Sequence, residues 1–227
     1  MKSIYWRCFL AILEKDIKIE LRSKETIATV SLFGIVLTFL FAFGFLGDPA
    51  TNLAVTPGIL WVALLFTGSL TIGRTFAREQ ENSAFTALAL SPTPRAAILS
   101  AKVLVNILVM LGVMLTITPL LAILMHIDLW PYLTGLSVLL SLSAVGFALV
   151  GTPLAVMAVG ARFPEVLLPM VVFPLVTPIM ICGVRGSAAL LGTSVDLDYL
   201  AWAQIILAFD LLIGVGNFFL FDWMVNE

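Results

Sequence analysis

The sequence predicts an all-α protein that crosses a membrane several times. Hydrophobic residues make up 61% of the 227 residues, charged residues only 11%, and the mean hydropathy is +1.11. Soluble domains carry about 25% charged residues, so this composition excludes a water-soluble core. The charges are also gathered into a few segments, and the stretches between those segments are long enough to cross a bilayer as helices.

Six stretches have the length and low charge of a membrane-spanning helix, which needs about 20 residues. We expect these spans over residues 27–46, 54–73, 103–125, 133–159, 166–183 and 200–221. An even number of spans places both chain ends on the same side of the membrane. A five-span or seven-span reading would move only the C-terminus across, so the last span is the least constrained by the charges.

The fifth of these spans is rich in proline. Its residues include Pro169, Pro174 and Pro178, with Pro164 just ahead of it. Each proline removes a backbone donor, and the freed carbonyls need partners in neighbouring helices, so we expect a kinked helix buried in protein. Residues 184–199 follow and are too short to span. They fit a pair of short re-entrant or interfacial helices on the outer face, or else a plain loop.

The basic residues indicate the orientation of the chain. Eleven of the twelve Lys and Arg residues lie in segments 1–26, 74–102 and 160–165, and the exception is Arg185. Cytoplasmic segments of membrane proteins carry the excess of Lys and Arg. The sequence therefore predicts that both termini are cytoplasmic and that segment 184–199 lies outside.

Residues 1–26 predict an amphipathic helix at the cytoplasmic interface. Its apolar stripe recurs at helical spacing, and its basic residues Lys15, Lys18 and Arg22 group on another face; the stripe consists of Trp6, Leu10, Leu13, Ile17 and Leu21. Such a helix lies with its apolar side in the acyl boundary and its lysines toward anionic lipid. It serves as an anchor, as an elbow that packs against a cytoplasmic subunit, or as both.

The longest cytoplasmic connection, residues 74–102, contains the signals of a short helix. Asn82 or Ser83 can cap its start, and the segment Ser91-Pro92-Thr93-Pro94 ends it. A helix this short is marginal alone in water, so its apolar face needs a surface to pack against.

Two surfaces fit this short helix. It folds back onto the membrane surface of its own protein, or it enters a groove of an ATPase as a coupling helix. In the second case Phe85 and Leu88 are the apolar anchors and Glu79 and Glu81 form a charged rim, which is how protein interfaces are built.

Two further polar sites stand out. Asp210 lies near the middle of the last span, where an ionisable group costs roughly 2.5–3.5 kcal/mol and is a functional candidate. We expect it to be protonated, paired with Asn217 or Asn106, or buried at a subunit interface. Arg162 and Glu165, between spans four and five, form either a second cytoplasmic contact or a plain solvated turn.

The sequence contains no catalytic signature, and we expect no enzymatic centre, bound cofactor or metal site in this chain. It lacks the G-x-x-x-x-G-K-[ST] loop that cradles nucleotide phosphates, so a pump of this kind needs a separate ATPase. His126 is the single histidine, so one copy of the chain cannot supply two axial histidines to a haem.

Three stretches resemble the CcmB family, the membrane subunits of the ABC transporter of cytochrome c maturation. They are DIKIELRSKET at 16–26, PGILWVALLFTGSLT at 57–71 and residues 74–94 around ENSAFTALAL. The resemblance extends over essentially the whole chain, including the proline-rich fifth span with FPLVTP at 173–178. None of these motifs is catalytic, and their combination is what is specific.

The resemblance implies an ABC-2 type (type V exporter) fold, with an amphipathic helix over 1–26 and a six-helix transmembrane domain over 27–227. It implies that loop 74–102 and the turn at 160–165 lie near the ATPase. The implied partners are the ATPase subunit CcmA, the membrane proteins CcmC and CcmD, and the haem chaperone CcmE, with two copies of this chain per complex in a bacterial inner membrane. Haem is the implied cargo, ATP is bound by the partner, and no nucleic acid is expected.

Two other functions remain open at this point. One is an ABC-2 permease for a lipid, glycan or drug, which is mildly disfavoured because no cavity lined by charged groups is evident. The other is an ion-coupled secondary transporter that uses Asp210.

Overall fold

The structure is a computed structural model, and it describes residues 2–81, 94–158, 164–193 and 197–225. The regular secondary structure of this part is entirely helical. The long helices are α1 (Lys2–Ser23), α2 (Glu25–Phe45), α3 (Pro49–Glu81), α5 (Arg95–Met125), α6 (Leu133–Ala158), α7 (Pro164–Leu190) and α8 (Tyr199–Val225), and a single 3-10 turn, η1 (Trp130–Tyr132), precedes α6.

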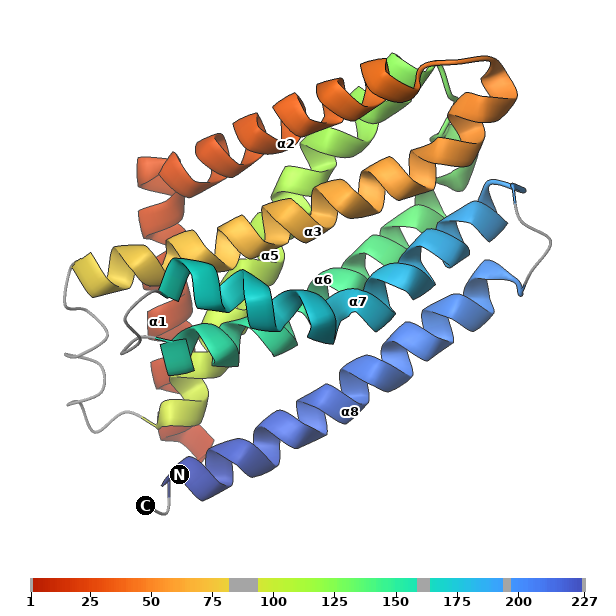
Figure 1. Ribbon diagram of the computed structural model, residues 1–227. Helices are drawn as coiled ribbons and strands as arrows, with labels where there is room; N and C mark the ends of the chain where they lie inside the picture. The colour runs from red at the N-terminus through yellow and green to blue at the C-terminus, as the bar shows by residue number, and fades with distance from the viewer. Residues whose placement is uncertain (1, 82–93, 159–163, 194–196, 226–227) are drawn as a thin grey trace.

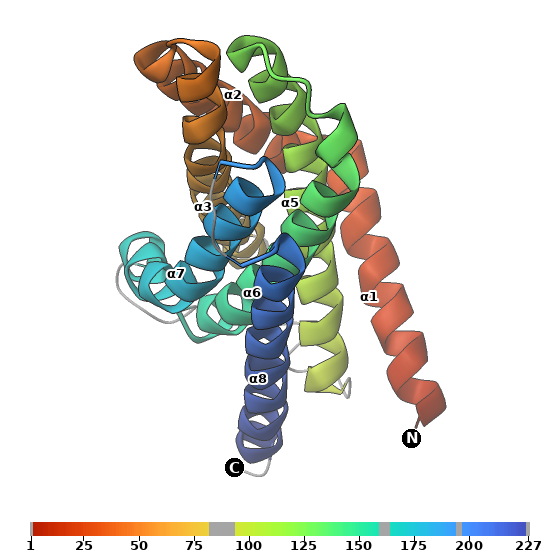
Figure 2. The same ribbon diagram turned by 90° about the vertical axis from the view of Figure 1, so that its right-hand side faces the viewer.

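Six helices form a slanted bundle, and α1 lies across one end of it (Figures 1 and 2). Within the bundle α5 is central, because it packs against α1, α2, α3 and α6. In contrast α8 lies at the edge, where it packs mainly on α6 and α7. The start of α1 and the end of α8 lie at the same end of the bundle (Figure 1).

The predicted number of membrane spans is confirmed. The six described helices that are long and apolar enough to cross a membrane cover Glu25–Phe45, Pro49–Thr75, Ala96–Met125, Trp130–Ala158, Val166–Leu190 and Tyr199–Asn217. Each contains or overlaps one predicted span. Helices α3, α5, α7 and α8 extend past the predicted ends, because a helix that leaves the hydrocarbon region keeps its own backbone hydrogen bonds.

The prediction for residues 184–199 was wrong in its first half. Residues 184–190 continue α7 without a break, and the chain then turns through Leu191 and Gly192, whose φ of +70° suits glycine. The next helix in the described residues is α8, from Tyr199. Arg185 lies in the last two turns of a long helix rather than in a separate re-entrant segment, since helical packing against α3 and α6 extends this far.

The proline-rich helix α7 changes direction along its length, as predicted (Figures 1 and 2). Pro169, Pro174 and Pro178 all lie inside it. The expectation that it is buried in protein was wrong for the single chain, because Pro174 and Pro178 are exposed and only 33% of its span is buried. One side of α7 therefore has no cover from the described residues of this chain.

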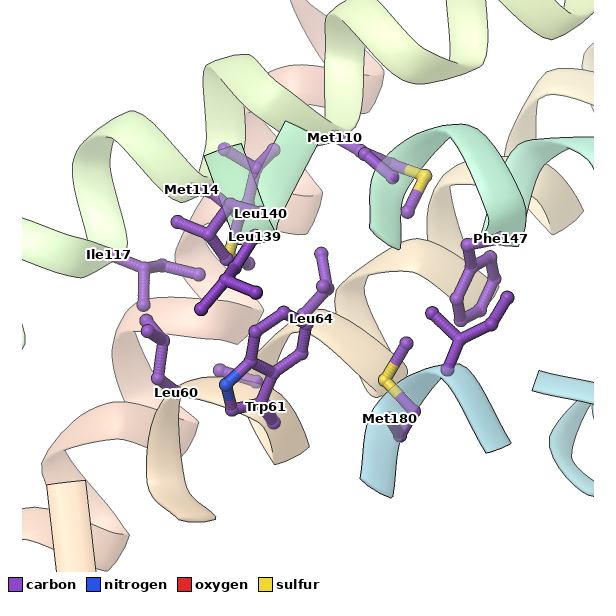
Figure 3. Close-up of a cluster of buried hydrophobic side chains, with 14 of the residues drawn as sticks. Leu60, Trp61, Leu64, Met110, Met114, Ile117, Leu139, Leu140, Phe147 and Met180 are labelled. Atoms are coloured by element: carbon purple, nitrogen blue, oxygen red, sulfur yellow. The ribbon is translucent and has the colours of Figure 1, made fainter. Parts of the chain in front are cut away.

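The core of the bundle fills the space between α3, α5, α6 and α7, and Trp61 lies in it (Figure 3). The indole Nε1 of Trp61 donates a hydrogen bond to Ser187 Oγ at 2.9 Å, which ties α3 to α7. The ring lies so close to Gly183 that a Cβ there would be 2.5 Å from it. Gly183 and Ser187, one turn apart, thus let the two helices approach as small residues do in membrane bundles.

The predicted amphipathic helix forms as α1, and it ends at a sharp elbow. Lys24 has a φ of +53°, which breaks the helix before α2 begins. Across this break Glu20 Oε1 accepts a hydrogen bond of 3.0 Å from the backbone nitrogen of Ile27. The Glu20 side chain therefore satisfies a donor at the start of α2 that has no partner inside the helix.

The apolar stripe of α1 divides between two environments. Trp6, Leu10 and Leu21 are exposed, as expected for a face that rests on a membrane. In contrast Ile12, outside the predicted stripe, is buried against α5. Helix α1 thus packs on its own chain as well as presenting an apolar face to the surroundings.

Candidate functional site

The predicted ATPase-coupling segment lies largely outside the described residues. Phe85 and Leu88 fall within 82–93, so the short helix expected there is neither confirmed nor contradicted. Glu79 and Glu81 belong to the last turn of α3, where only the backbone is described. The role of these four residues stays a prediction. The structure describes the helices on either side of the segment, α3 before it and α5 after it.

The second predicted cytoplasmic contact is described in part. Arg162 lies in 159–163, outside the described residues, and Glu165 belongs to the first turn of α7, where only the backbone is described. One turn further Leu168 faces α3, since a Cβ on Gly73 would lie 4.0 Å from its Cδ2. The end of α3 and the start of α7 therefore meet at the same end of the bundle (Figure 1).

Helix α1 holds the start of α5. The Tyr5 hydroxyl donates a hydrogen bond to Ser100 Oγ at 3.0 Å, and Ser100 in turn donates to the Ala96 carbonyl at 2.8 Å. Beside this bond Ile12 packs against Ile98 and Ala101 in a small apolar cluster. The first turns of α5, which directly follow the predicted coupling segment, are thus attached to α1.

An ion pair strengthens this attachment. The Lys102 side chain on α5 is 0% exposed, and its Nζ lies 3.5 Å from Asp16 Oδ2 on α1. The other oxygen of Asp16 lies 2.9 Å from Lys15 Nζ. A buried ammonium is costly unless it is paired, so α1 stabilises α5 at this point by covering Lys102 and by supplying the carboxylate.

One turn along α5 a second polar group connects three helices. Asn106 is fully buried; its Oδ1 accepts a hydrogen bond from Thr75 Oγ1 of α3, and its Nδ2 donates to Thr152 Oγ1 of α6, both at 3.0 Å. In an apolar environment these side chains would be unsatisfied without such interhelical hydrogen bonds. The polar hub, as we call Asp16, Thr75, Lys102, Asn106 and Thr152, therefore links α5 to α1, α3 and α6.

The polar hub was only partly visible in the sequence. Lys102 and Asn106 are four residues apart, so a helix places them on one face, which is the signal that could have suggested a shared polar contact. Lys102 instead looked like an ordinary basic residue at the cytoplasmic end of a span. Because the polar hub connects α5 to α1, α3 and α6, a displacement of the start of α5 would be transmitted to these three helices.

Of the three alternatives for Asp210, pairing with Asn217 or Asn106 is not formed in the described structure. Asn217 Nδ2 donates to the Leu149 carbonyl at 2.7 Å, and Asn106 belongs to the polar hub, so neither amide pairs with Asp210. The Asp210 side chain is 4% exposed, and within the described chain neither carboxylate oxygen has a hydrogen-bond partner. The carboxylate lies against Gly146 of α6, where an added Cβ would collide with Oδ1.

An apolar groove of ≈ 750 Å³ lies between α5 and α6 near Trp130, which is itself 81% exposed. Of the side chains that commonly bind haem iron, its lining offers only Met114. His126 lies outside this lining, at the end of α5, in a left-handed conformation with φ +55°. Within the described residues no group of three or more His, Cys, Asp or Glu side chains is placed to hold a metal ion.

Comparison with known proteins places the chain in a family. Residues 7–220 match the family described as CcmB protein. The heme exporter protein B of Rhodobacter capsulatus is 31% identical over 195 residues, which cover 84% of this chain and 88% of the relative. The proteins of the same name from Paracoccus denitrificans and Bradyrhizobium diazoefficiens are each 31% identical, over 79% and 80% of this chain and 83% and 81% of the relatives. The chain therefore belongs to the CcmB family.

Proposed function

We propose that this chain is the permease subunit of an ABC transporter that serves cytochrome c maturation and is required for haem export. The observation that carries the proposal is the family membership, which extends over residues 7–220 and is joined by relatives named heme exporter protein B. Six helices long enough to span a membrane suit such a subunit. We propose no enzymatic centre for the chain itself.

The proposed location is the inner membrane of a bacterium, with both termini in the cytoplasm. The support is the distribution of Lys and Arg, eleven of which lie in segments on one side. The six spans and the common end of the bundle that holds the start of α1 and the end of α8 agree with it (Figure 1).

The energy for transport is proposed to come from a separate ATPase, CcmA. The support is the lack of a phosphate-binding loop in the sequence. Phe85 and Leu88 would anchor the ATPase, Glu79 and Glu81 would form the rim of the contact, and the turn with Arg162 and Glu165 would add a second contact. The polar hub supports this route, because movement of the start of α5 acts on α1, α3 and α6.

The proposed cargo step is haem export or the ATP-driven release of haem-loaded chaperone CcmE, within an assembly that also contains CcmC and CcmD and two copies of this chain. The single histidine of the chain argues that firm haem ligands belong to a partner. In this proposal the chain supplies a mechanical step, and Lys102 and Asn106 lie on the helix that delivers it.

The proposal is tested by deletion and complementation. Cells without the gene for this chain are expected to lose covalent haem in their c-type cytochromes, measured by haem-stained gels, and to regain it with the wild-type gene. A purified complex with CcmE is then compared with and without ATP hydrolysis for haem bound to the chaperone. Normal cytochromes in the deletion strain would contradict the proposal.

The coupling segment gives a more local prediction. Phe85→Ala combined with Leu88→Ala is expected to weaken co-purification with the ATPase or to uncouple ATP hydrolysis from cytochrome assembly, because the apolar anchors are lost. The matched control is Phe43→Ala with Leu40→Ala, which removes exposed apolar area from the membrane-spanning helix α2 instead. Normal complex yield together with normal cytochromes in the Phe85/Leu88 variant would remove the coupling assignment.

A further inference from the structure

Asp210 lies about halfway between the two ends of the bundle, as its position in its own helix and those of its neighbours in two other helices show. It is near the centre of α8 (Tyr199–Val225), Gly146 beside it is near the centre of α6 (Leu133–Ala158), and Ile179, the third neighbour, is near the centre of α7 (Pro164–Leu190). The carboxyl group is therefore expected to lie near the middle of the membrane, far from both surfaces. An ionisable group at this depth is costly, and such groups pair with a partner.

The chain itself does not provide this partner in the described structure. The two amides that the sequence offered as partners, Asn217 and Asn106, bond instead to Leu149 and within the polar hub. After Lys102 the basic residues in the sequence are His126, Arg162 and Arg185, which lie at the end of α5, between spans four and five and near the far end of α7. A second copy of this chain therefore brings no cation to the depth of Asp210.

A groove leads to Asp210 between α6 and α8. It measures ≈ 540 Å³ and, besides Asp210, its lining is apolar: Leu142, Val145, Leu149, Leu207, Leu211, Gly214 and Val215. The side chains of each helix recur every three or four residues, which makes two ridges of the kind that receive a third helix. Gly214, one turn after Asp210, has no side chain and leaves room beside the carboxyl group.

The surroundings of α8 agree with a missing neighbour. Of the six spans it has the smallest buried share, 17%, and Leu207, Leu211 and Val215 on the groove rim are all exposed. A lipid chain can fill such a groove, but it offers the Asp210 carboxyl group neither a hydrogen-bond donor nor an opposite charge. A protein helix with a positively charged side chain covers the exposed apolar area and also pairs with the carboxylate.

We propose that the groove between α6 and α8 receives a membrane-spanning helix of another subunit, and that this helix carries one basic side chain near its middle, which pairs with Asp210. On docking, the carboxylate turns about its two side-chain bonds from Gly146 into the groove. The inference rests on the multi-subunit transporter proposed above, but it does not depend on the cargo or on the coupling segment.

The test reads contact in the intact assembly. A photo-crosslinking amino acid is placed at Leu211, which lines the groove and is 62% exposed, and in a matched variant at Leu212, which is 69% exposed on the same turn but does not line it. After irradiation of membranes that contain all subunits, crosslinked peptides are identified by mass spectrometry. We expect Leu211, and not Leu212, to capture a predicted spanning segment of a different subunit with Lys, Arg or His near its centre.

A second arm tests the charge. Asp210→Asn, which keeps the shape of the side chain, is expected to remove most of the Leu211 product at unchanged membrane levels of the chain. Exchange of the charges, with Asp210→Lys and an acid in place of the captured basic residue, is expected to restore it. The proposal is overturned if Leu211 captures only lipid, a second copy of this chain or a segment without a basic residue, or if Asp210→Asn leaves the product unchanged. Co-purification with the ATPase in the same preparation separates this failure from a failure of the proposed function.

Discussion

Among the polar groups that the bundle buries in apolar surroundings, the polar hub and the middle of α8 differ in whether the chain supplies the partners. In the polar hub the Lys102 side chain faces Asp16, and Asn106 bonds to hydroxyls on two other helices. In the middle of α8 the Asp210 carboxylate has no hydrogen-bond partner in the described chain. The first region therefore stabilises the subunit itself, whereas the second is incomplete until something outside the chain binds.

The largest effect is expected at the ion pair of the polar hub. Asp16→Ala removes the carboxylate that faces buried Lys102, and we expect a loss of up to about 3–5 kcal/mol in the free energy of unfolding, because a desolvated ammonium loses its opposite charge on α1. The measurement is unfolding of the purified chain by SDS in mixed micelles. Lys15→Met is the control, since that lysine is 42% exposed and is expected to contribute about 0–1 kcal/mol.

The double variant Asp16→Ala with Lys102→Met sharpens this result. It removes both charges, so most of the stability lost in Asp16→Ala is expected to return. A double variant as unstable as the single one would mean that packing of α1, and not the ion pair, determines the stability at this point.

A smaller loss is expected at Asn106. Asn106→Leu removes the acceptor of Thr75 and the donor to Thr152, and we expect the same unfolding measurement to show a loss of about 1–2 kcal/mol. Thr116→Val is a suitable control, because that hydroxyl bonds only to its own helix, at the Val113 carbonyl. Equal stability of the two variants would show that the hub does not depend on its central amide.

Thr152→Val tests a single bond of the hub and is expected to cost about 0.6 kcal/mol, which is the average for interhelical hydrogen bonds in membranes. The shape of the side chain is nearly kept, so packing against α5 changes little. A loss as large as that of Asn106→Leu would indicate that the Thr152 bond carries most of the hub's contribution.

The smallest effect on the isolated chain is expected at Asp210. Asp210→Leu keeps the branching of the side chain and removes a carboxylate without partners, so the free energy of unfolding is expected to stay the same or to rise. Cytochrome assembly in cells is expected to fall, because the contact with the partner helix is lost. A loss of stability above about 1 kcal/mol would break the comparison, since it would mean that the chain does stabilise this group.

The sequence predicts the spans well and the end of α7 poorly, because hydropathy indicates which residues lie in the membrane but not how helices pack. The spans were predictable because a charge-free run of about 20 residues has few other solutions in a membrane. Residues 184–190 were misjudged, since Arg185 and Gly186 interrupt the apolar pattern, whereas packing against Trp61 and the neighbouring helices stabilises the helix through this segment. The residue composition of the segment alone does not reveal this packing.

The same distinction applies to the candidate sites. Asp210 was recognisable from the sequence as an acid at mid-depth, but the sequence could not show that Asn217 and Asn106 are committed elsewhere. Lys102 looked like a residue that faces the cytoplasm, and only the position of α1 shows that it is buried. The partners of a side chain depend on helices far away along the sequence.

The sequence by itself determined the number of spans and the family, because hydropathy and motifs are properties of single segments; its basic residues also predict the orientation. The tertiary structure alone decided which polar groups find partners, since that depends on how α1, α3 and α6 meet around α5 and on which side of α8 is left open. Burial in an apolar medium makes that difference large in free energy, and so it separates the polar hub, which stabilises the subunit, from Asp210, for which we propose a partner in another subunit.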